Sequence, residues 1–429
     1  LPSSWILLWE LPFWFIFIFG SLVPATMIPK DEWFGIPMKV SDAITLVSAA
    51  FYGTAGLIRF VLKPGISGAA TIVMATLAMF GYGSLRLIGG PLEAEDLLAM
   101  GFALMLAASA PIQAAGILSM YSPVETKGFI NRLVVFVALV SLVYTAESVF
   151  GLGLRSEASI NLNSDFGIQR VRGPLYGSST GYLLLLPALG WAIGSFFDEN
   201  RKKSYAVLTT TILFSAYLGL GSRAALILLV VFMISNLIML RRSKRSEATG
   251  FVLAGFCVCM GFLIYAQADT QRLTQFEDTH RRLTHETAAN ILVTEPVAAS
   301  LLGQGYGAIW PWYRRDTLRT ESIAHGDNII ATGFGASLYH SHSTLLELVI
   351  EFGLIGVCWL LFILIRTARL PLTKQASTSW RVFALAVLVS FCSFGFDLFI
   401  FKEVRVNSVW WIFLIASYQL PRATEMNEI

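Results

Sequence analysis

The sequence predicts an all-α protein that crosses a membrane many times. Hydrophobic residues make up 55% of its 429 residues, and charged residues only 14%. The mean hydropathy is +0.65, whereas a soluble protein carries charge on about a quarter of its positions. Apolar runs of about 20 residues, enough to cross roughly 30 Å of hydrocarbon as a helix, recur along the whole chain. These observations exclude an ordinary soluble globule and predict a polytopic membrane protein.

Twelve apolar segments are predicted to be transmembrane helices. They centre on residues 5–23, 43–62, 68–88, 97–117, 129–150, 178–197, 204–220, 223–240, 248–267, 342–366, 380–398 and 404–420. Two connections are long, residues 151–177 and 268–341. We therefore divide the chain into three parts. They are residues 1–267 with nine helices and the loop 151–177, a loop domain at 268–341, and residues 342–429 with three helices and the C-terminus.

Lysine and arginine in the short connections predict the orientation, because cytoplasmic loops are enriched in these residues. With a cytoplasmic N-terminus, the inner connections carry clusters such as Arg201–Lys203 and Arg241–Arg245. The short outer connections carry fewer cations, chiefly Lys30, Lys39 and Lys402. We therefore expect both ends in the cytoplasm and both long loops on the outer face.

The small net charge and the cysteines exclude two further classes. A net charge of +3 without a basic tail argues against nucleic acid as a partner. All four cysteines fall inside apolar segments, so we expect small buried residues and no disulfide scaffold. They are Cys257, Cys259, Cys358 and Cys392.

Arg223 stands out because it follows Gly221-Ser222 where the eighth predicted helix begins. An arginine at a bilayer edge costs up to a few kcal/mol unless it reaches water or meets an anion. Its planar guanidinium matches phosphate oxygens, and the N–H groups of a helix N-terminus also favour an anion. Arg223 therefore either extends to the aqueous surface or forms part of an anion site.

His342 begins the tenth predicted helix on the outer face, and Ser343 and Thr344 are positioned to cap its first turn. A neutral imidazole can accept a proton from a sugar hydroxyl, so His342 is a candidate general base, with a capping role as the alternative. His340 and His342 also form a His-x-His pair. A metal would need further ligands, for which His280, His285, Asp327 or Glu351 are candidates. No other metal-binding motif is present, and we expect none.

Four short elements on the predicted outer face occur in an order that is typical of one protein family. The run from His342 to Gly356 opens a helix with histidine and ends in Glu-x-Gly-x-x-Gly. Three elements precede it: Arg170-Val171-Arg172-Gly173, Gly221-Ser222-Arg223, and a loop element from Arg281 and Arg282 through Pro296 to Gly303-Gln304-Gly305. Together, over roughly residues 165–360, they resemble the O-antigen ligase/polymerase superfamily. Ser343 stands where that family usually has Asn, Ala224 where it has Gly, and Ser178-Ser179-Thr180 where it has Asn-Pro-Asn.

The resemblance implies a glycan-joining enzyme with a multi-span fold of the GT-C type. Members of the family transfer glycans from undecaprenyl diphosphate to an acceptor, at the periplasmic side of the Gram-negative inner membrane. Ligases use lipid A–core as the acceptor, and polymerases extend the repeat unit. A single large outer loop before the histidine helix favours a ligase.

The expected chemistry needs no cofactor. Arginines can stabilise the departing diphosphate electrostatically in a partly dehydrated cleft. We assign this role to Arg223, to Arg281 or Arg282, and to Arg170 or Arg172, with His342 as the base for an inverting transfer. Three loop aromatics are candidates to stack on sugars, although such residues are also common interfacial anchors. They are Trp310, Trp312 and Tyr313.

Two alternatives remain open. A repeat-unit polymerase would use the same chemistry on a different acceptor. A polysaccharide or lipid transporter would need polar or charged residues through the membrane interior, where this chain has few. The main cases are Glu10, Arg59, Glu147 and Asp397.

Overall fold

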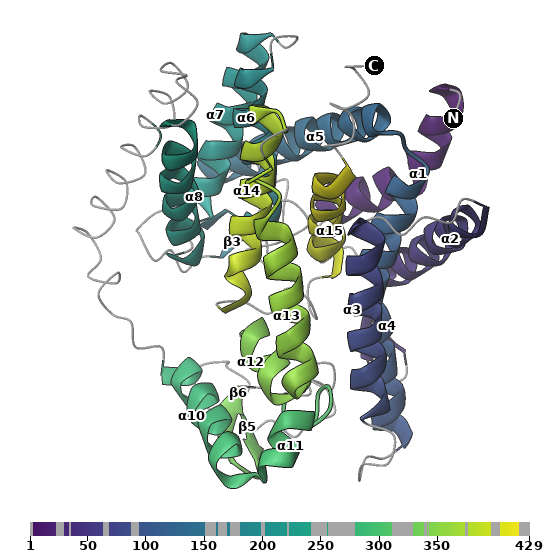
Figure 1. Ribbon diagram of the computed structural model, residues 1–429, viewed down its shortest axis with the longest axis vertical. Helices are drawn as coiled ribbons and strands as arrows, with labels where there is room; N and C mark the ends of the chain where they lie inside the picture. The colour runs from purple at the N-terminus through teal and green to yellow at the C-terminus, as the bar shows by residue number, and fades with distance from the viewer. Residues whose placement is uncertain are drawn as a thin grey trace.

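The computed structural model consists of a bundle of helices with a smaller unit of short helices and strands at one end (Figure 1). It describes residues 3–22, 30–33, 36–62, 68–86, 94–150, 160–161, 170–171, 181–198, 202–220, 223–241, 255, 279–310, 329–338, 341, 343–373, 376–395 and 404–419. These residues contain fourteen α-helices, and their strands form three two-stranded antiparallel hairpins. The predicted all-α class is confirmed.

Eleven of the twelve predicted segments correspond to described helices. In the bundle these are α1 (Ser3–Leu22), α2 (Val40–Leu62), α3 (Gly68–Leu85), α4 (Ala94–Ser119), α5 (Pro123–Phe150), α6 (Tyr182–Gly194), α7 (Lys203–Gly219), α8 (Arg223–Arg241), α13 (Gly353–Ala368), α14 (Thr378–Phe391) and α15 (Val404–Gln419). The segment 248–267 lies outside the described residues except for Gly255. Short hairpins join β1 (Lys30–Trp33) to β2 (Ile36–Lys39) and β3 (Ile160–Asn161) to β4 (Arg170–Val171).

Four stretches within the described residues are long and apolar enough to cross a membrane. They are Gly68–Leu85, Met100–Ser119, Pro123–Ala146 and Thr378–Gly395. Five shorter apolar helices accompany them. Several long apolar helices in one chain indicate a multi-pass membrane protein, and the number of twelve spans stays a prediction.

The tenth predicted segment is two helices rather than one. Helix α12 (Thr344–Ile350) ends before Glu351-Phe352, and α13 begins at Gly353. Gly353 has φ of +60°, a left-handed conformation that interrupts an α-helix and that glycine adopts most easily. The expectation of one continuous helix over 342–366 was therefore wrong.

The centre of the bundle is α6, in which every residue is buried. It packs against α14, α15 and α7. Gly190 allows the closest approach, because a Cβ at this position would lie 2.2 Å from the Ala386 Cβ on α14. Close packing through small residues is typical of helices within membranes.

Helix ends that the charge pattern predicts to be cytoplasmic lie close together. At the start of α5, Lys127 pairs with Asp198, just after α6, at 2.8 Å. At the end of α15, the Gln419 amide donates to the Leu118 carbonyl near the end of α4, at 3.3 Å. The orientation of the helices relative to the membrane stays a prediction.

The smaller unit is built from loop residues together with α12. It contains α10 (Thr279–Thr294), α11 (Val297–Leu302) and the hairpin of β5 (Ile329–Thr332) and β6 (Gly335–Leu338). Its own apolar core comprises Ala288, Ile291, Ile309, Trp310 and Ile350. Because Ile350 belongs to this core and Leu348 belongs to the core of the bundle, α12, the helix that follows His342, packs against both units (Figure 1).

The cysteines differ in part from the prediction. Cys358 in α13 is exposed on the protein surface, and Cys392 is partly buried. Cys257 and Cys259 lie outside the described residues. The expectation of burial was wrong for Cys358, because α13 turns this residue outward.

Candidate functional site

The turn that carries His342 is anchored on both sides. His342 itself lies outside the described residues, but Ser341 and Ser343 are buried. The Ser343 hydroxyl accepts the Leu346 N–H at 3.3 Å, which confirms the predicted cap of α12. The Ser341 hydroxyl accepts the Ser343 N–H at 3.2 Å and lies 2.9 Å from the Glu347 Oε2, to which it can donate. The backbone next to His342 is therefore fixed.

Glu351 connects α12 to the loop through backbone hydrogen bonds. Its carboxyl group is fully buried. Oε2 accepts the Gly307 N–H at 2.7 Å, and Oε1 accepts those of Ile309 and Trp310 at 3.2 Å and 3.0 Å. A carboxylate that receives several N–H groups forms strong hydrogen bonds with defined geometry. Glu351, considered above as a metal ligand, is engaged by protein donors instead.

The glycines of the two elements meet at van der Waals distance. Gly303, Gly305 and Gly307 all have positive φ, of 76°, 99° and 73°. A Cβ on Gly303 would lie 2.5 Å from the Glu351 carbonyl oxygen, and one on Gly353 would lie 2.5 Å from the Gly303 nitrogen. No side chain fits at either position. We call residues 303–307 the glycine loop.

Main-chain hydrogen bonds complete this junction. The Gln304 N–H donates to the Ile350 carbonyl, and the Gly305 N–H donates to the Glu351 carbonyl, both at 2.9 Å. The Gly303-x-Gly305 element and the Glu351-x-Gly353 element are therefore in direct contact, although more than 40 residues separate the bonded groups.

Burial shifts the ionisation of Glu351 at this junction. It raises the pKa of Glu351 to about 7, while the N–H groups of Gly307, Trp310 and Ile309 and a hydrogen bond with Glu347 act in the opposite direction. Glu347 lies one helical turn earlier and is also fully buried. Two buried carboxyl groups, those of Glu347 and Glu351, therefore lie in, and directly after, the helix that follows the turn with His342.

The end of α3 holds the glycine loop from the bundle side. The Tyr82 hydroxyl donates to the Leu302 carbonyl at 2.6 Å, and the Arg86 Nη2 donates to the Gly303 carbonyl at 2.9 Å. Sequence reasoning missed both residues. Arg86 lies at the predicted outer end of the third apolar segment, so the signal of an arginine at a bilayer edge that singled out Arg223 applied to it as well.

The predicted arginines lie on several elements. Arg223 is the first residue of α8, as predicted, Arg170 is in β4, and Arg281 is in α10, but their side chains lie outside the described atoms. The Arg282 side chain is exposed and lies 3.3 Å from Glu286. Arg172 is outside the described residues.

Helix packing brings two of these elements near α12. Helix α10, with Arg281 and Arg282, packs against α12. The single turn η6 (Cys392–Gly395) after α14 contacts both α12 and α8, the helix that Arg223 begins. Strand β4, with Arg170, lies against α5 and α7.

The predicted sugar-stacking residues have different outcomes. Trp310 is fully buried, and its Nε1 donates to the Ser337 hydroxyl at 2.9 Å, so its ring belongs to the core of the loop unit. Trp312 and Tyr313 lie outside the described residues.

The metal alternative rests on residues that are largely not described. Asp327 and His340, like His342, are outside the described part, and within that part no group of three His, Cys, Asp or Glu side chains is placed to hold a metal ion. The His-x-His pair therefore stays an open alternative.

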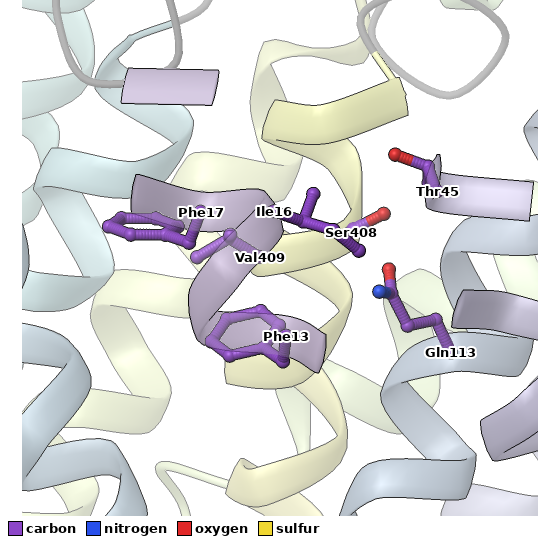
Figure 2. A pocket seen from close by; sticks show the side chains of 7 residues that line it. All are labelled: Phe13, Ile16, Phe17, Thr45, Gln113, Ser408 and Val409. Carbon is purple, nitrogen blue, oxygen red and sulfur yellow. The ribbon is translucent and has the colours of Figure 1, made fainter. Parts of the chain in front are cut away.

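A cavity in the bundle is too small for a substrate. Its volume is about 10 Å³, and it lies among α1, α2, α4 and α15. Figure 2 shows apolar side chains beside the polar groups of Gln113, Thr45 and Ser408. Such a cavity has room for roughly one water molecule and none for a sugar.

Comparison with known proteins identified no significant match. No protein-family model matches the chain, and no curated protein is significantly similar to it.

Proposed function

We propose that this protein is an O-antigen ligase that transfers a glycan from undecaprenyl diphosphate to a sugar hydroxyl of lipid A–core. The transfer takes place on the periplasmic side of the inner membrane. The observation that carries the proposal is the direct contact between the glycine loop and the Glu351-x-Gly353 element. These belong to two of the four sequence elements on which the resemblance rests, and a shared site requires such elements to come together.

The proposed reaction is a single displacement. The acceptor oxygen attacks the anomeric carbon of the donor, the bond from that carbon to the diphosphate oxygen breaks, and the configuration inverts. His342 receives the proton of the acceptor hydroxyl. Arg223, together with Arg281 or Arg282 and Arg170 or Arg172, stabilises the charge that develops on the diphosphate.

Glu351 and the glycine loop position these groups and do not react themselves. The turn before α12 is fixed by Ser341 and Ser343, α12 is fixed to the loop by Glu351, and α10 packs on α12. An error of about 1 Å in the placement of a reacting group can cost roughly 100-fold in rate. A rigid junction beneath the base therefore suits a transferase.

Transfer by the purified protein in proteoliposomes tests the proposal. The donor is a labelled glycan on undecaprenyl diphosphate, and lipid A–core is the acceptor. Labelled lipid A–core supports the ligase, whereas a longer carrier-linked glycan would identify a polymerase. Movement of the intact donor across the bilayer without transfer would identify a transporter. Activity should survive EDTA; its loss, with recovery on adding one divalent ion, would favour the His-x-His site.

A further inference from the structure

Helix α11 and the end of α10 expose an apolar surface on the loop unit. Leu292 and Val293 on α10 are 49% and 83% exposed, and Val297, Leu301 and Leu302 on α11 are 75%, 51% and 49% exposed. We call these five residues the α11 patch. No residue of α11 is buried, and the helix contains no charged residue. An exposed apolar surface of this kind marks a place where another apolar phase or molecule makes contact.

Hydrogen bonds to the main chain fix α11 at the end of a candidate membrane span. The Leu302 carbonyl accepts from the Tyr82 hydroxyl, and the next carbonyl, that of Gly303, accepts from Arg86. Tyr82 and Arg86 lie in and just after the last turn of α3, one of the helices long enough to cross a membrane. The α11 patch is therefore held next to the end of α3.

The α11 patch also continues an apolar stripe on α13. Leu354, Cys358, Leu361 and Ile365 are exposed at spacings of four, three and four residues, which places them on one face of the helix. Helix α11 packs against α13, and Gly353 lies against the Leu301 carbonyl. The exposed apolar face of α13 thus lies next to the α11 patch.

We propose that the α11 patch inserts into the interfacial layer of the bilayer on the loop side, with lipid acyl chains as its occupant. Its continuity with the α13 stripe favours lipid. A stable protein partner would need about 20–30 residues on each side, many more than the patch provides. Arg86 suits this position, because a long cationic side chain at a membrane boundary can keep its charge among the headgroups. The proposal does not depend on glycan transfer.

Spin labels measure this insertion directly. The full chain, with its four cysteines replaced, would receive a single cysteine at Val297 or Leu301 and a nitroxide label. It would then be placed in liposomes of phosphatidylethanolamine and phosphatidylglycerol. The chain that retains only Cys358 serves as the lipid-facing control. Glu286→Cys serves as the aqueous control, because the Glu286 side chain is 57% exposed on α10.

The labels at positions 297 and 301 should be several-fold more accessible to oxygen, relative to a water-soluble nickel complex, than the label at position 286. They should resemble the Cys358 label. The proposal would be overturned if these labels preferred the nickel complex as much as the label at position 286 does. It would also be overturned if the labels were immobile and shielded from both reagents, because that result would indicate a protein partner.

Discussion

Two fully buried glutamates in this protein have different kinds of hydrogen-bond partner. Glu10 in α1 accepts from the Arg132 guanidinium, from the Tyr121 hydroxyl at 2.9 Å and from the Trp14 indole at 2.7 Å. Glu351 accepts from three backbone N–H groups of a glycine-rich turn. The first carboxylate is neutralised by a cation from another helix, whereas the second has no cationic partner among the described residues and is held mainly by main-chain N–H groups, with a further hydrogen bond to Glu347.

This difference separates an interaction that stabilises the bundle, at Glu10, from one that positions the candidate site, at Glu351. Side-chain partners at Glu10 join α1, α5 and the turn between α4 and α5, far along the chain from the elements of the resemblance. Main-chain partners at Glu351 fix the course of a loop, which determines where the neighbouring groups lie.

The largest expected effect is that of Glu351→Ala. It leaves three buried N–H groups without their acceptor, at about 1–3 kcal/mol for each group that stays unsatisfied. We expect transfer to fall at least roughly 100-fold, since a small displacement of reacting groups has an effect of that size. Glu351→Gln keeps the volume and one acceptor oxygen and should retain more activity. An active Glu351→Ala in the liposome transfer assay would contradict the positioning role.

Gly303→Ala should have the next largest effect. Its Cβ would lie 2.5 Å from the Glu351 carbonyl oxygen, and its positive φ adds strain of about 1–3 kcal/mol. Both the unfolding temperature in detergent and the rate of transfer should fall. Gly101→Ala is the matched control, because a Cβ there meets nothing within 4 Å. Equal behaviour of the two variants would show that the glycine loop does not need its close contact.

Glu10→Gln tests the other side of the comparison. It removes the ion pair with Arg132, whose side chain is 44% exposed and so is not left as a fully buried charge. The loss of stability should therefore be modest, on the order of 1–2 kcal/mol. Thermal unfolding should occur at lower temperature, while transfer at a permissive temperature stays unchanged. If transfer were abolished while the fold is retained, Glu10 would belong to the site.

The smallest effect concerns pH. Burial raises the pKa of Glu351 to about 7, above the value of about 4.3 for a free glutamate. The stability contributed by its neutral form is complete below the unfolded-state pKa and is lost as pH rises through about 7. Between about pH 5 and about pH 8, the unfolding temperature of the wild type should fall relative to Glu351→Gln. If the difference in unfolding temperature between the two proteins did not change with pH, Glu351 would not titrate in this range.

Hydropathy predicted much of the fold, because helix formation in an apolar segment depends on local composition. The segments near α3, α4 and α5 and the start of α8 at Arg223 follow from it directly. The division at Glu351-Phe352 does not, since Gly353 adopts positive φ against the backbone of a loop about 50 residues earlier. The sequence of 342–356 contains no sign of that partner.

The site was predictable only in outline. The order of the four elements suggested that they belong together, and the cap by Ser343 followed from local chemistry. The acceptor role of Glu351 and the contacts of Tyr82 and Arg86 with the glycine loop depend on tertiary packing. No local pattern carries that information.

The most direct test of the proposed reaction compares four proteins in the same liposome transfer assay: wild type, Arg223→Lys, His342→Ala and His340→Ala. Arg223→Lys keeps the charge but loses the planar pair of donors, so turnover should drop by one to several orders of magnitude, at about 1.4 kcal/mol per tenfold. His342→Ala should be similarly impaired, with His340→Ala largely active. A fully active Arg223→Lys, or an inactive His340→Ala beside an active His342→Ala, would contradict the assignment.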